Sequence, residues 1–512
     1  MRHGNGALVS PSSNSSSSDA RAERSRGPPG SLPAPTKADF EEGVVLTAEQ
    51  FDLVIIGGGP GGYAAALYAA SAGLSVALVE KDKVGGTCLH RGCIPAKEFL
   101  ETAATYRHVR DASEFGINSG PPTVDFAVSQ ARKQKIVDQL WKGLSGLIKN
   151  RKIASHQGVG KLGPNHAVTV TSADGSTVEL QGKNIVLAAG SVPRSIPGFD
   201  PDGRIVMTSD EVLMLDKVPA SIAVIGGGAI GCEFASTFAD LGSRVTILEA
   251  LPKILPGVDA DVAAVVVRAF GKKGIAIKTS ATITGHTPNA TGTSVQIADG
   301  ESVDVEAVIV SVGRRPYVDE CGLHGTAVVV NDRGFIDVDE WCRTAEPGVF
   351  AVGDVIAGPQ LAHVGYAEAI LVVKQILGEP CAPVMYDRVP WAIYCQPEVA
   401  FAGHSEESAK AAGFDVVVSK HQYRANSRAL ILGEVDGLVK VIAEKRADGT
   451  AGRILGVHMV GPWVTEQLGQ GYLAVNWEAT VAEVAEFLQP HPSLSELFGE
   501  TMLSLTGRSL NV

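Results

Sequence analysis

The chain has 512 residues, of which 45% are hydrophobic and 20% are charged, an ordinary globular composition with room for about three or four domains. Its formal net charge of −12 repels nucleic-acid phosphates and anionic membrane surfaces, and no apolar run approaches the roughly 18 residues of a membrane span. Nucleic acid and membrane are therefore not expected as partners. Seven cysteines are too few for a secreted disulfide scaffold, so we expect a cytoplasmic protein in a reducing environment.

Residues 1–46 differ from the rest of the chain. They contain the serine run Ser15–Ser18 and offer almost nothing to bury, so we expect a disordered N-terminal extension. Its serines and arginines also fit a transit peptide for an organelle matrix, although Asp19 and Glu23 weaken that interpretation. We favour a dispensable extension.

A strand, a glycine turn, a helix and a second strand follow from Phe51 to Glu80. This order is that of a dinucleotide-binding βαβ unit. Gly57 permits the tight turn, Gly59 lets the backbone approach a pyrophosphate, and Gly62 lets the helix pack on the strand. The acid at the end of the second strand is placed to accept hydrogen bonds from the adenosine ribose.

Two cysteines, Cys88 and Cys93, come directly after this unit. On an ideal helix their Cα atoms would lie about 8.7 Å apart, beyond the roughly 4.4–6.8 Å that a disulfide tolerates. A bond between them requires a distorted helical turn, for which Gly85, Gly86 and Gly92 supply backbone freedom. The alternatives are two unpaired thiols or half of a metal site, but the other cysteines are scattered singly. These are Cys232, Cys321, Cys342, Cys381 and Cys395.

Regular elements continue toward the middle of the chain. Helical patterns cover residues 97–109 and 136–147 as one or two long helices, and apolar runs at 168–170, 178–180 and 185–187 predict strands. The last run ends in small residues and is interpreted as the crossing into a second nucleotide domain.

The second nucleotide unit runs from Ser221 to Glu249 and repeats the first. Gly226, Gly228 and Gly231 form its turn, and the interval from the first glycine to the acid is 23 residues in both units. An acid at this place pairs with a ribose 2′-hydroxyl and repels a 2′-phosphate, which favours NAD over NADP. The alternative for Glu249 is a solvated carboxylate at a strand end.

The first site is expected to hold FAD. A nicotinamide passes two electrons as hydride, whereas a disulfide accepts them through thiolate chemistry, so a flavin is the natural relay between them. A later apolar strand, residues 348–352, is followed by Gly353-Asp354. Asp354 is placed to hold the flavin's ribityl chain, although alone it would pass as a turn residue.

The chain changes character from about residue 387. Strand-like runs and two helical stretches without a glycine motif predict a compact α+β domain. The runs are residues 416–418, 438–442 and 454–460, and the helices are residues 464–477 and 480–488. His491 with Glu496 five residues later can form a base and the carboxylate that orients it. The alternative is a surface histidine that caps the next helix.

In this order the motifs resemble those of the flavin-dependent pyridine nucleotide-disulfide oxidoreductases, over roughly residues 50–512. The resemblance implies an α/β fold with two Rossmann-like dinucleotide-binding domains and a C-terminal α+β dimerisation domain. The implied domains are a disordered extension (1–46), an FAD domain in two parts (47–195 and 319–386), an NAD domain (196–318) and the dimerisation domain (387–512).

The resemblance also implies a role for each site residue. Cys88 would attack substrate, Cys93 would stack against the flavin, and Lys97 would lie near the flavin and pair with Glu233. His491 and Glu496 would act as the base from the partner subunit of a homodimer. Cofactor contacts would come from Gly57, Gly59, Gly62, Glu80, Lys97, Gly190 and Asp354 for FAD, and from Gly226, Gly228, Gly231, Glu249 and Gly313 for NAD.

Within the family, the redox and C-terminal motifs are most similar to those of members that oxidise protein-bound dihydrolipoamide, with lipoyl domains of 2-oxoacid dehydrogenase or glycine cleavage complexes as partners. The alternatives are a glutathione-type or mercuric reductase, or a scaffold without activity. Glu249 disfavours the first, and the absence of any cysteine after Cys395 disfavours the second. Departures from the family pattern are His90-Arg91, Ala96, Ala189 and Gln360, none of which removes a reacting group.

Overall fold

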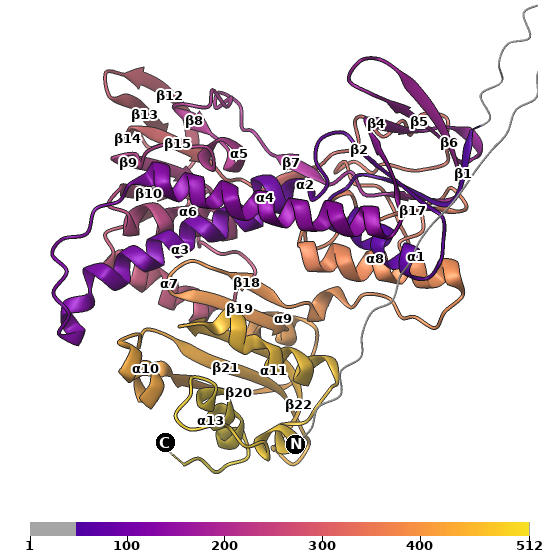
Figure 1. Ribbon diagram of the computed structural model, residues 1–512. Helices are drawn as coiled ribbons and strands as arrows, with labels where there is room; N and C mark the ends of the chain where they lie inside the picture. The colour runs from indigo at the N-terminus through magenta and orange to yellow at the C-terminus, as the bar shows by residue number, and fades with distance from the viewer. Residues whose placement is uncertain (1–47, 511–512) are drawn as a thin grey trace, which may run out of the picture. The chain divides into compact units, whose positions relative to one another are not determined.

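The computed structural model describes residues 48–510, and the expectations for the N-terminal extension lie outside this range (Figure 1). Within it, no helix combines the length and the apolar character needed to cross a membrane. The described chain contains one sheet with a parallel centre and an antiparallel edge, one parallel sheet, and a C-terminal antiparallel sheet, each with helices packed on it. The predicted fold class is therefore confirmed.

The first sheet has the strand order β3-β2-β1-β6-β5-β4, and β17 adds to β6 from far along the chain. Its parallel centre follows the predicted strand pattern, but residues 178–187 form one strand rather than two. The first half of β6 pairs with the antiparallel β5, and the second half is buried between β1 and β17. The strands are β1 (Glu49–Ile56), β2 (Val76–Glu80), β3 (Ala154–Gln157), β4 (Val159–Leu162), β5 (Ala167–Thr171), β6 (Thr177–Leu187) and β17 (Val349–Ala351).

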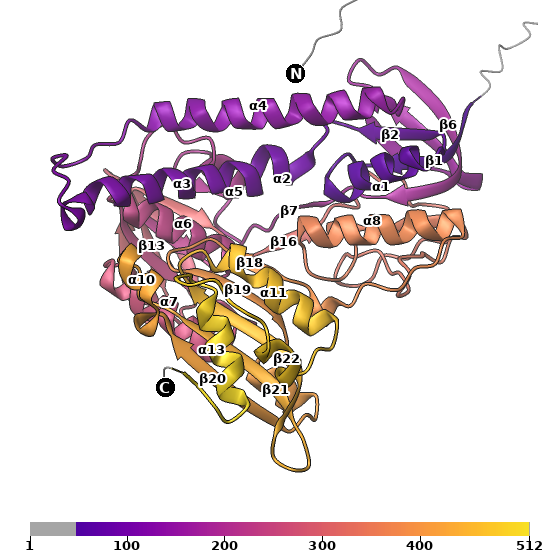
Figure 2. The same ribbon diagram turned by 60° about the horizontal axis from the view of Figure 1, so that its bottom comes forward.

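Helices of the first nucleotide domain come from two distant parts of the sequence. α1 follows the glycine turn and packs along α8, while α3 and α4 run side by side, as Figure 2 shows. The predicted one or two long helices after the cysteines are thus two. The helices are α1 (Pro60–Ser71), α2 (Gly86–Arg91), α3 (Cys93–Arg110), α4 (Phe126–Asn150) and α8 (Ala362–Leu377).

The second parallel sheet has the order β11-β10-β9-β15-β8, and a three-stranded antiparallel sheet, β12-β13-β14, lies in the same segment of the chain. The chain enters and leaves this region through β7 and β16, which pair antiparallel. The elements are β7 (Ser191–Pro193), β8 (Val206–Met207), α5 (Ser209–Val212), β9 (Ser221–Ile225), α6 (Ala229–Asp240), β10 (Arg244–Leu248), α7 (Ala260–Lys272), β11 (Ala276–Lys278), β12 (Ile283–Asn289), β13 (Gly292–Ile297), β14 (Ser302–Val305), β15 (Ala307–Val310) and β16 (Arg314–Pro316).

The C-terminal domain is a five-stranded antiparallel sheet of order β18-β19-β22-β21-β20 with helices packed on it. The helix predicted over residues 480–488 is shorter, because α12 ends at Ala485 and leaves Phe487 and Leu488 exposed. The elements are β18 (Trp391–Ile393), β19 (Glu398–Gly403), α9 (Glu406–Ala411), β20 (Val416–Gln422), α10 (Ser427–Leu432), β21 (Leu438–Lys445), β22 (Ala451–Gly461), α11 (Val464–Asn476), α12 (Val481–Ala485) and α13 (Glu496–Leu505).

One hydrophobic core joins all three regions. Phe99 of α3 and Phe126 of α4 pack in the same buried cluster as Phe238 of α6 and Val460 of β22. Burial of this apolar surface fixes α3, the helix that begins at Cys93, against the second nucleotide domain. The core therefore positions one cysteine beside residues of another domain.

Candidate active site

The two nucleotide turns have the same hydrogen bonds. In the first, Gly58 N–H donates to Glu80 Oε2 at 2.7 Å, and in the second, Gly227 N–H donates to Glu249 Oε2 at 2.6 Å. A second backbone N–H, two residues after each acid, donates to the other carboxylate oxygen at 2.8 Å and 2.7 Å respectively. Each carboxylate is thus held at the glycine turn, as the sequence interval predicts.

In each turn, one glycine is required because a side chain there would clash with the backbone. A Cβ on Gly62 would lie 1.8 Å from Gly57 O, and one on Gly231 would lie 2.0 Å from Gly226 O, so helix and turn touch through these positions. By contrast, a Cβ on Gly228 would meet no protein atom within 4 Å, which leaves room for a ligand. Neither α1 nor α6 has a side-chain cap at its N-terminus.

These observations fit dinucleotides at both turns. Uncapped backbone N–H groups at a helix N-terminus are donors for a pyrophosphate, and the carboxylates are placed for ribose hydroxyls. A cavity lined by Gly57, Glu80 and Gly160 extends from the first turn, where the adenosine of FAD would lie. Glu249 is 7% exposed, so a 2′-phosphate there would face a buried negative charge, which fits NAD rather than NADP.

The cysteines lie where one helix stops and the next begins. α2 ends at Arg91, Gly92 departs from helical geometry (φ −145°, ψ −112°), and α3 begins at Cys93, so the expected distortion is present. Both cysteines are free thiols here, and the structure describes the dithiol form. The disulfide between Cys88 and Cys93 stays a prediction.

The two thiols differ in proton affinity. The hydrogen bond that Cys93 accepts from Cys88 and the charge of Lys97 lower the pKa of Cys93 to about 7, against the opposing effect of burial. The same hydrogen bond raises the pKa of Cys88, and burial, the second largest effect, raises it further. In the dithiol form Cys93 is therefore the thiol that ionises more readily, and Cys88 holds its proton more tightly.

Lys97 is the cation next to this thiolate. It lies four residues after Cys93 on α3, on the same helix face, and its Nζ is 2.9 Å from both carboxylate oxygens of Glu233 on α6. Tyr394 N–H also donates to Glu233, at 2.9 Å, and its ring lies 4.7 Å from Nζ. Burial lowers the pKa of Lys97, but Glu233 more than offsets this, so the net shift is upward and the amine stays charged.

The predicted cofactor glycines after the strands lie at the crossings between domains. Gly190 (φ +77°) precedes β7 and Gly313 (φ +98°) precedes β16, and both have the left-handed backbone that favours glycine. Asp354 accepts a hydrogen bond from Ser191 Oγ, which also accepts one from Arg314 Nε at 2.7 Å. The structure thus brings Asp354 to the start of both crossings.

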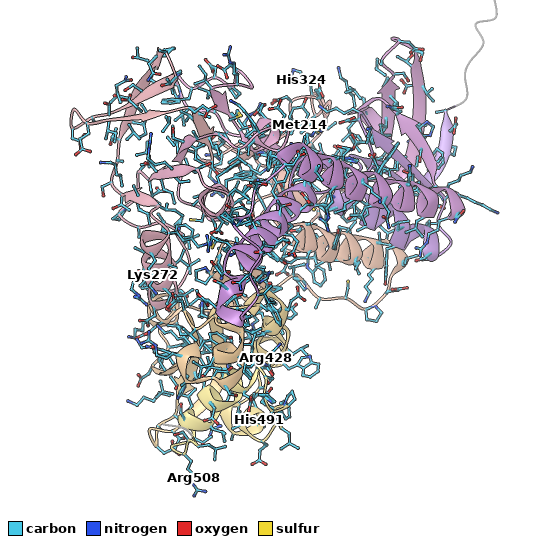
Figure 3. All side chains as sticks on the ribbon, turned by 60° about the vertical axis from the view of Figure 1, so that its left-hand side comes forward. Met214, Lys272, His324, Arg428, His491 and Arg508 are labelled. Carbon is cyan, nitrogen blue, oxygen red and sulfur yellow. The ribbon has the colours of Figure 1, made fainter. Side chains whose placement is uncertain are left out.

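His491 and Glu496 form the predicted pair. His491 Nδ1 is 2.7 Å from Glu496 Oε1, and Ser493 N–H holds the other carboxylate oxygen at 2.7 Å. The imidazole is 74% exposed, and Figure 3 shows it in the C-terminal domain with Arg428. The cysteines of the same chain are elsewhere, because α2 and α13 are well separated in Figures 1 and 2.

Several neighbours of the site were not predicted. Ser191 donates to Asp354 and Arg314 donates to Ser191, and Tyr63 and Tyr366 lie near the thiols. Tyr63 directly follows the first glycine turn, which is the only sequence signal that could have found it. Two departures from the family pattern fasten α2 to the preceding loop: His90 Nε2 contacts Val84 O at 2.9 Å, and Arg91 contacts Asp82 at 3.3 Å.

Comparisons with known proteins agree with this geometry. The chain matches the model of the pyridine nucleotide-disulphide oxidoreductases over residues 51–369 and that of their dimerisation domain over residues 389–502. It is 41% identical to a dihydrolipoyl dehydrogenase of Bacillus subtilis, over 91% of this chain and 100% of that protein, and 38% identical to one of Zymomonas mobilis with the same coverage.

Solved structures give the same result. LpdA from Mycobacterium tuberculosis superposes with a TM-score of 0.84 at 27% identity, covering 90% of this chain and 100% of that one. The Cu(II) complex of the HOCl-induced flavoprotein disulfide reductase RclA from Escherichia coli superposes with a TM-score of 0.79 at 26% identity, covering 89% and 99%. Two nucleotide turns, a thiol pair between them and a C-terminal dimerisation domain place this chain in the pyridine nucleotide-disulphide oxidoreductase family.

Proposed function

We propose that this chain oxidises protein-bound dihydrolipoamide to lipoamide and reduces NAD⁺ to NADH. The observation that carries the proposal is the thiol pair at the break between α2 and α3, in which the hydrogen bond from Cys88 and the charge of Lys97 lower the pKa of Cys93 to about 7. The similarity to curated dihydrolipoyl dehydrogenases over 91% of the chain supports the same substrate class.

The thiol chemistry follows from the different environments of the two cysteines. One thiolate of the substrate attacks Cys88 Sγ, which breaks the Cys88–Cys93 bond and releases Cys93 as the thiolate beside Lys97. The second substrate thiol then attacks the mixed disulfide, so lipoamide leaves and Cys88 takes a proton. Two electrons have moved from substrate to protein, and Lys97 stabilises the negative charge that the first step creates.

The residues present fit FAD in the first nucleotide site. Gly57, Gly59, Glu80 and Asp354 would hold it, and Lys97 would lie near its ring. When bound, FAD supplies the two-electron relay from the dithiol to NAD⁺. The turn at Gly226 and Glu249 would hold the NAD, so that substrate and nucleotide reach opposite ends of the relay. The net change is dihydrolipoamide plus NAD⁺ giving lipoamide, NADH and one proton.

The base is proposed to come from a second copy of the chain. His491 uses Nδ1 to contact Glu496, so Nε2 is left to take the substrate thiol proton, and the carboxylate stabilises the imidazolium that forms. A homodimer agrees with the dimerisation-domain match and with the exposed apolar side chains of the C-terminal domain, which a partner surface would cover. These are Leu430, Ile431, Trp463, Leu473, Trp477, Phe487 and Leu488.

The protein partners proposed for the site are the lipoyl domains of a 2-oxoacid dehydrogenase or glycine cleavage complex. Their lipoyl group is a dithiol on a long alkyl arm, which can reach thiols set between two domains.

Steady-state assays with dihydrolipoamide and NAD⁺, and with NADH against lipoamide, glutathione disulfide and mercuric ion, test the proposal. We expect turnover with the lipoyl substrates and a flavin spectrum in the purified protein. Cys88→Ser is expected to abolish lipoamide turnover and to leave the flavin bound. Activity confined to glutathione disulfide or mercuric ion, or a protein without bound flavin, would overturn it.

A further inference from the structure

Two tyrosines from distant parts of the chain meet beside the thiols. Tyr63 lies in the first turn of α1 and Tyr366 in the first turns of α8, and their hydroxyl groups share a hydrogen bond. The ring centroids are 5.7 Å apart and the rings are tilted by 53°. Neither residue has a role in the chemistry described above.

Small residues explain why the two rings meet. α1 and α8 approach closely at Gly61 and Gly365, where a Cβ on Gly61 would lie 3.5 Å from Gly365 O and a Cβ on Gly365 would lie 3.4 Å from Gly61 N. Each tyrosine comes within two residues of its glycine. The close backbone contact therefore places the two phenols against each other and keeps them there.

The pair lies on the Cys88 side of the dithiol. α2 begins at Gly86, and a Cβ there would lie 2.6 Å from the Cα of Gly59, the residue that precedes α1. Tyr63 and Cys88 therefore lie in the first turns of two helices whose N-terminal ends touch. Cys93, in contrast, is next to Lys97 and Glu233 on α3 and α6. The tyrosines come from α1 and α8, whereas the Lys97–Glu233 ion pair comes from α3 and α6.

Both phenols are neutral at physiological pH, since burial raises the pKa of Tyr63 and of Tyr366. Both are also half-buried, so part of each ring still faces open space. The pair offers ring surface and one O–H beyond its internal hydrogen bond, and carries no cation. Such a surface suits an alkyl chain and gives a peptide carboxylate no partner.

We propose that Tyr63 and Tyr366 form a wall beside Cys88 that selects substrates by width, admitting a narrow alkyl dithiol and excluding bulky peptide disulfides. The hydrogen bond ties the two rings together, so neither ring can swing aside without breaking it. The substrate assignment in this inference rests on the proposed function, but the wall itself does not.

Alkylation of Cys88 tests the wall without any substrate. The reduced holoenzyme is treated with iodoacetamide or with a fluorescein maleimide, and the rate at which Cys88 is modified is followed by peptide mass spectrometry. We expect Tyr366→Ala and Tyr63→Ala each to raise the rate with the bulky maleimide about tenfold, the discrimination typical of an apolar pocket wall, while iodoacetamide changes by less than about twofold.

Two further variants separate the ring from the hydrogen bond and from general damage. Tyr366→Phe keeps the ring but loses the hydrogen bond to Tyr63, and is expected to raise the maleimide rate by only about two- to threefold. Tyr68→Ala removes another half-buried tyrosine from α1 and is expected to leave both rates unchanged. Retention of the flavin spectrum identifies the variants that fold. The two alanine substitutions lie on different helices, so damage to one helix would not explain an equal effect of both.

The proposal is overturned if neither alanine variant raises the rate at which the maleimide modifies Cys88. It is also overturned if the rates with both reagents rise equally, which would indicate a changed thiol pKa instead of a wider opening. With NADH as donor, the ratio of kcat/KM for lipoamide to that for glutathione disulfide is expected to fall about tenfold in Tyr366→Ala. If the native enzyme shows no lipoamide turnover, the proposed function fails, and the alkylation rates still decide whether the wall exists.

Discussion

Charge substitutions at the Lys97–Glu233 ion pair should move the pKa of Cys93 in opposite directions. Lys97→Met removes the cation beside the thiolate and leaves the carboxylate, so the pKa should rise above its value of about 7. Glu233→Gln removes an anion whose charge raises the pKa of Cys93, so the pKa should fall. The amide of this second variant would keep an oxygen for Tyr394 N–H, which now donates to the carboxylate at 2.9 Å.

The size of the effect follows from the geometry. Residues four apart on a helix face have side chains about 5–6 Å apart, and two unit charges at about 6 Å interact by about 3 kcal/mol at an effective dielectric constant of about 20. That corresponds to about 2 pKa units. Because the Lys97 side chain is 34% exposed, we expect solvent screening to leave about 1 unit for Lys97→Met.

The pH dependence of the long-wavelength thiolate-to-flavin absorbance in the reduced holoenzyme measures this pKa directly, and the pH dependence of Cys93 alkylation gives a second reading. Lys135→Met removes an exposed lysine from α4 and serves as the matched control. Equal shifts in the same direction for Lys97→Met and Glu233→Gln, or no shift in either, would refute the electrostatic account of the thiolate.

Four other predictions follow from single contacts. Gly62→Ala should cause loss of bound flavin, whereas Gly231→Ala should keep the yellow colour and lose NADH binding by calorimetry, because each Cβ would lie within 2.0 Å of a carbonyl oxygen in its own turn. His491→Gln should lower kcat with dihydrolipoamide about 10²–10⁴-fold, and Glu496→Gln by less, at unchanged flavin content. Glu249→Gln should raise kcat/KM for NADP about tenfold in steady-state assays, since the amide still accepts from Gly227 N–H but no longer repels a 2′-phosphate. Burial raises the pKa of Glu368 from 4.5 to about 7, so the folded protein loses stability as pH rises from 4.5 to 7. Glu368→Gln should remove about 3 kcal/mol of this loss, which would be measured as a smaller fall of Tm across the same pH range.

Sequence reasoning works best at the nucleotide turns, for a physical reason. The contacts that require Gly62 and Glu80 lie within one βαβ unit, so their spacing is readable along the chain. The break in the helix at Gly92 is equally local. By contrast, the partner of Lys97 lies on a helix of another domain, and only the family resemblance pointed to Glu233.

One prediction was wrong, and one contact went unpredicted, where the structure depends on residues outside the local pattern. The apolar pattern of residues 480–488 predicts a helix up to Leu488, but the helix ends at Ala485 and Leu488 is 98% exposed. This chain therefore does not bury these apolar side chains itself, and they belong to the surface that we propose a second copy covers. Tyr366 had no signal at all, since its contact with Tyr63 spans 303 residues.

The helices that follow the two nucleotide turns each place a side chain near one of the two thiols. α1 begins after Gly59 and presents Tyr63 in its first turn, on the Cys88 side. α6 begins after Gly228 and presents Glu233 in its second turn, against the lysine that stabilises Cys93. Each helix therefore leaves backbone N–H groups free of a side-chain cap at its N-terminal end, where a cofactor would bind, and places a side chain near one sulfur about one turn later. Because the helix is rigid over so short a span, a shift of either nucleotide turn must move the environment of the corresponding thiol.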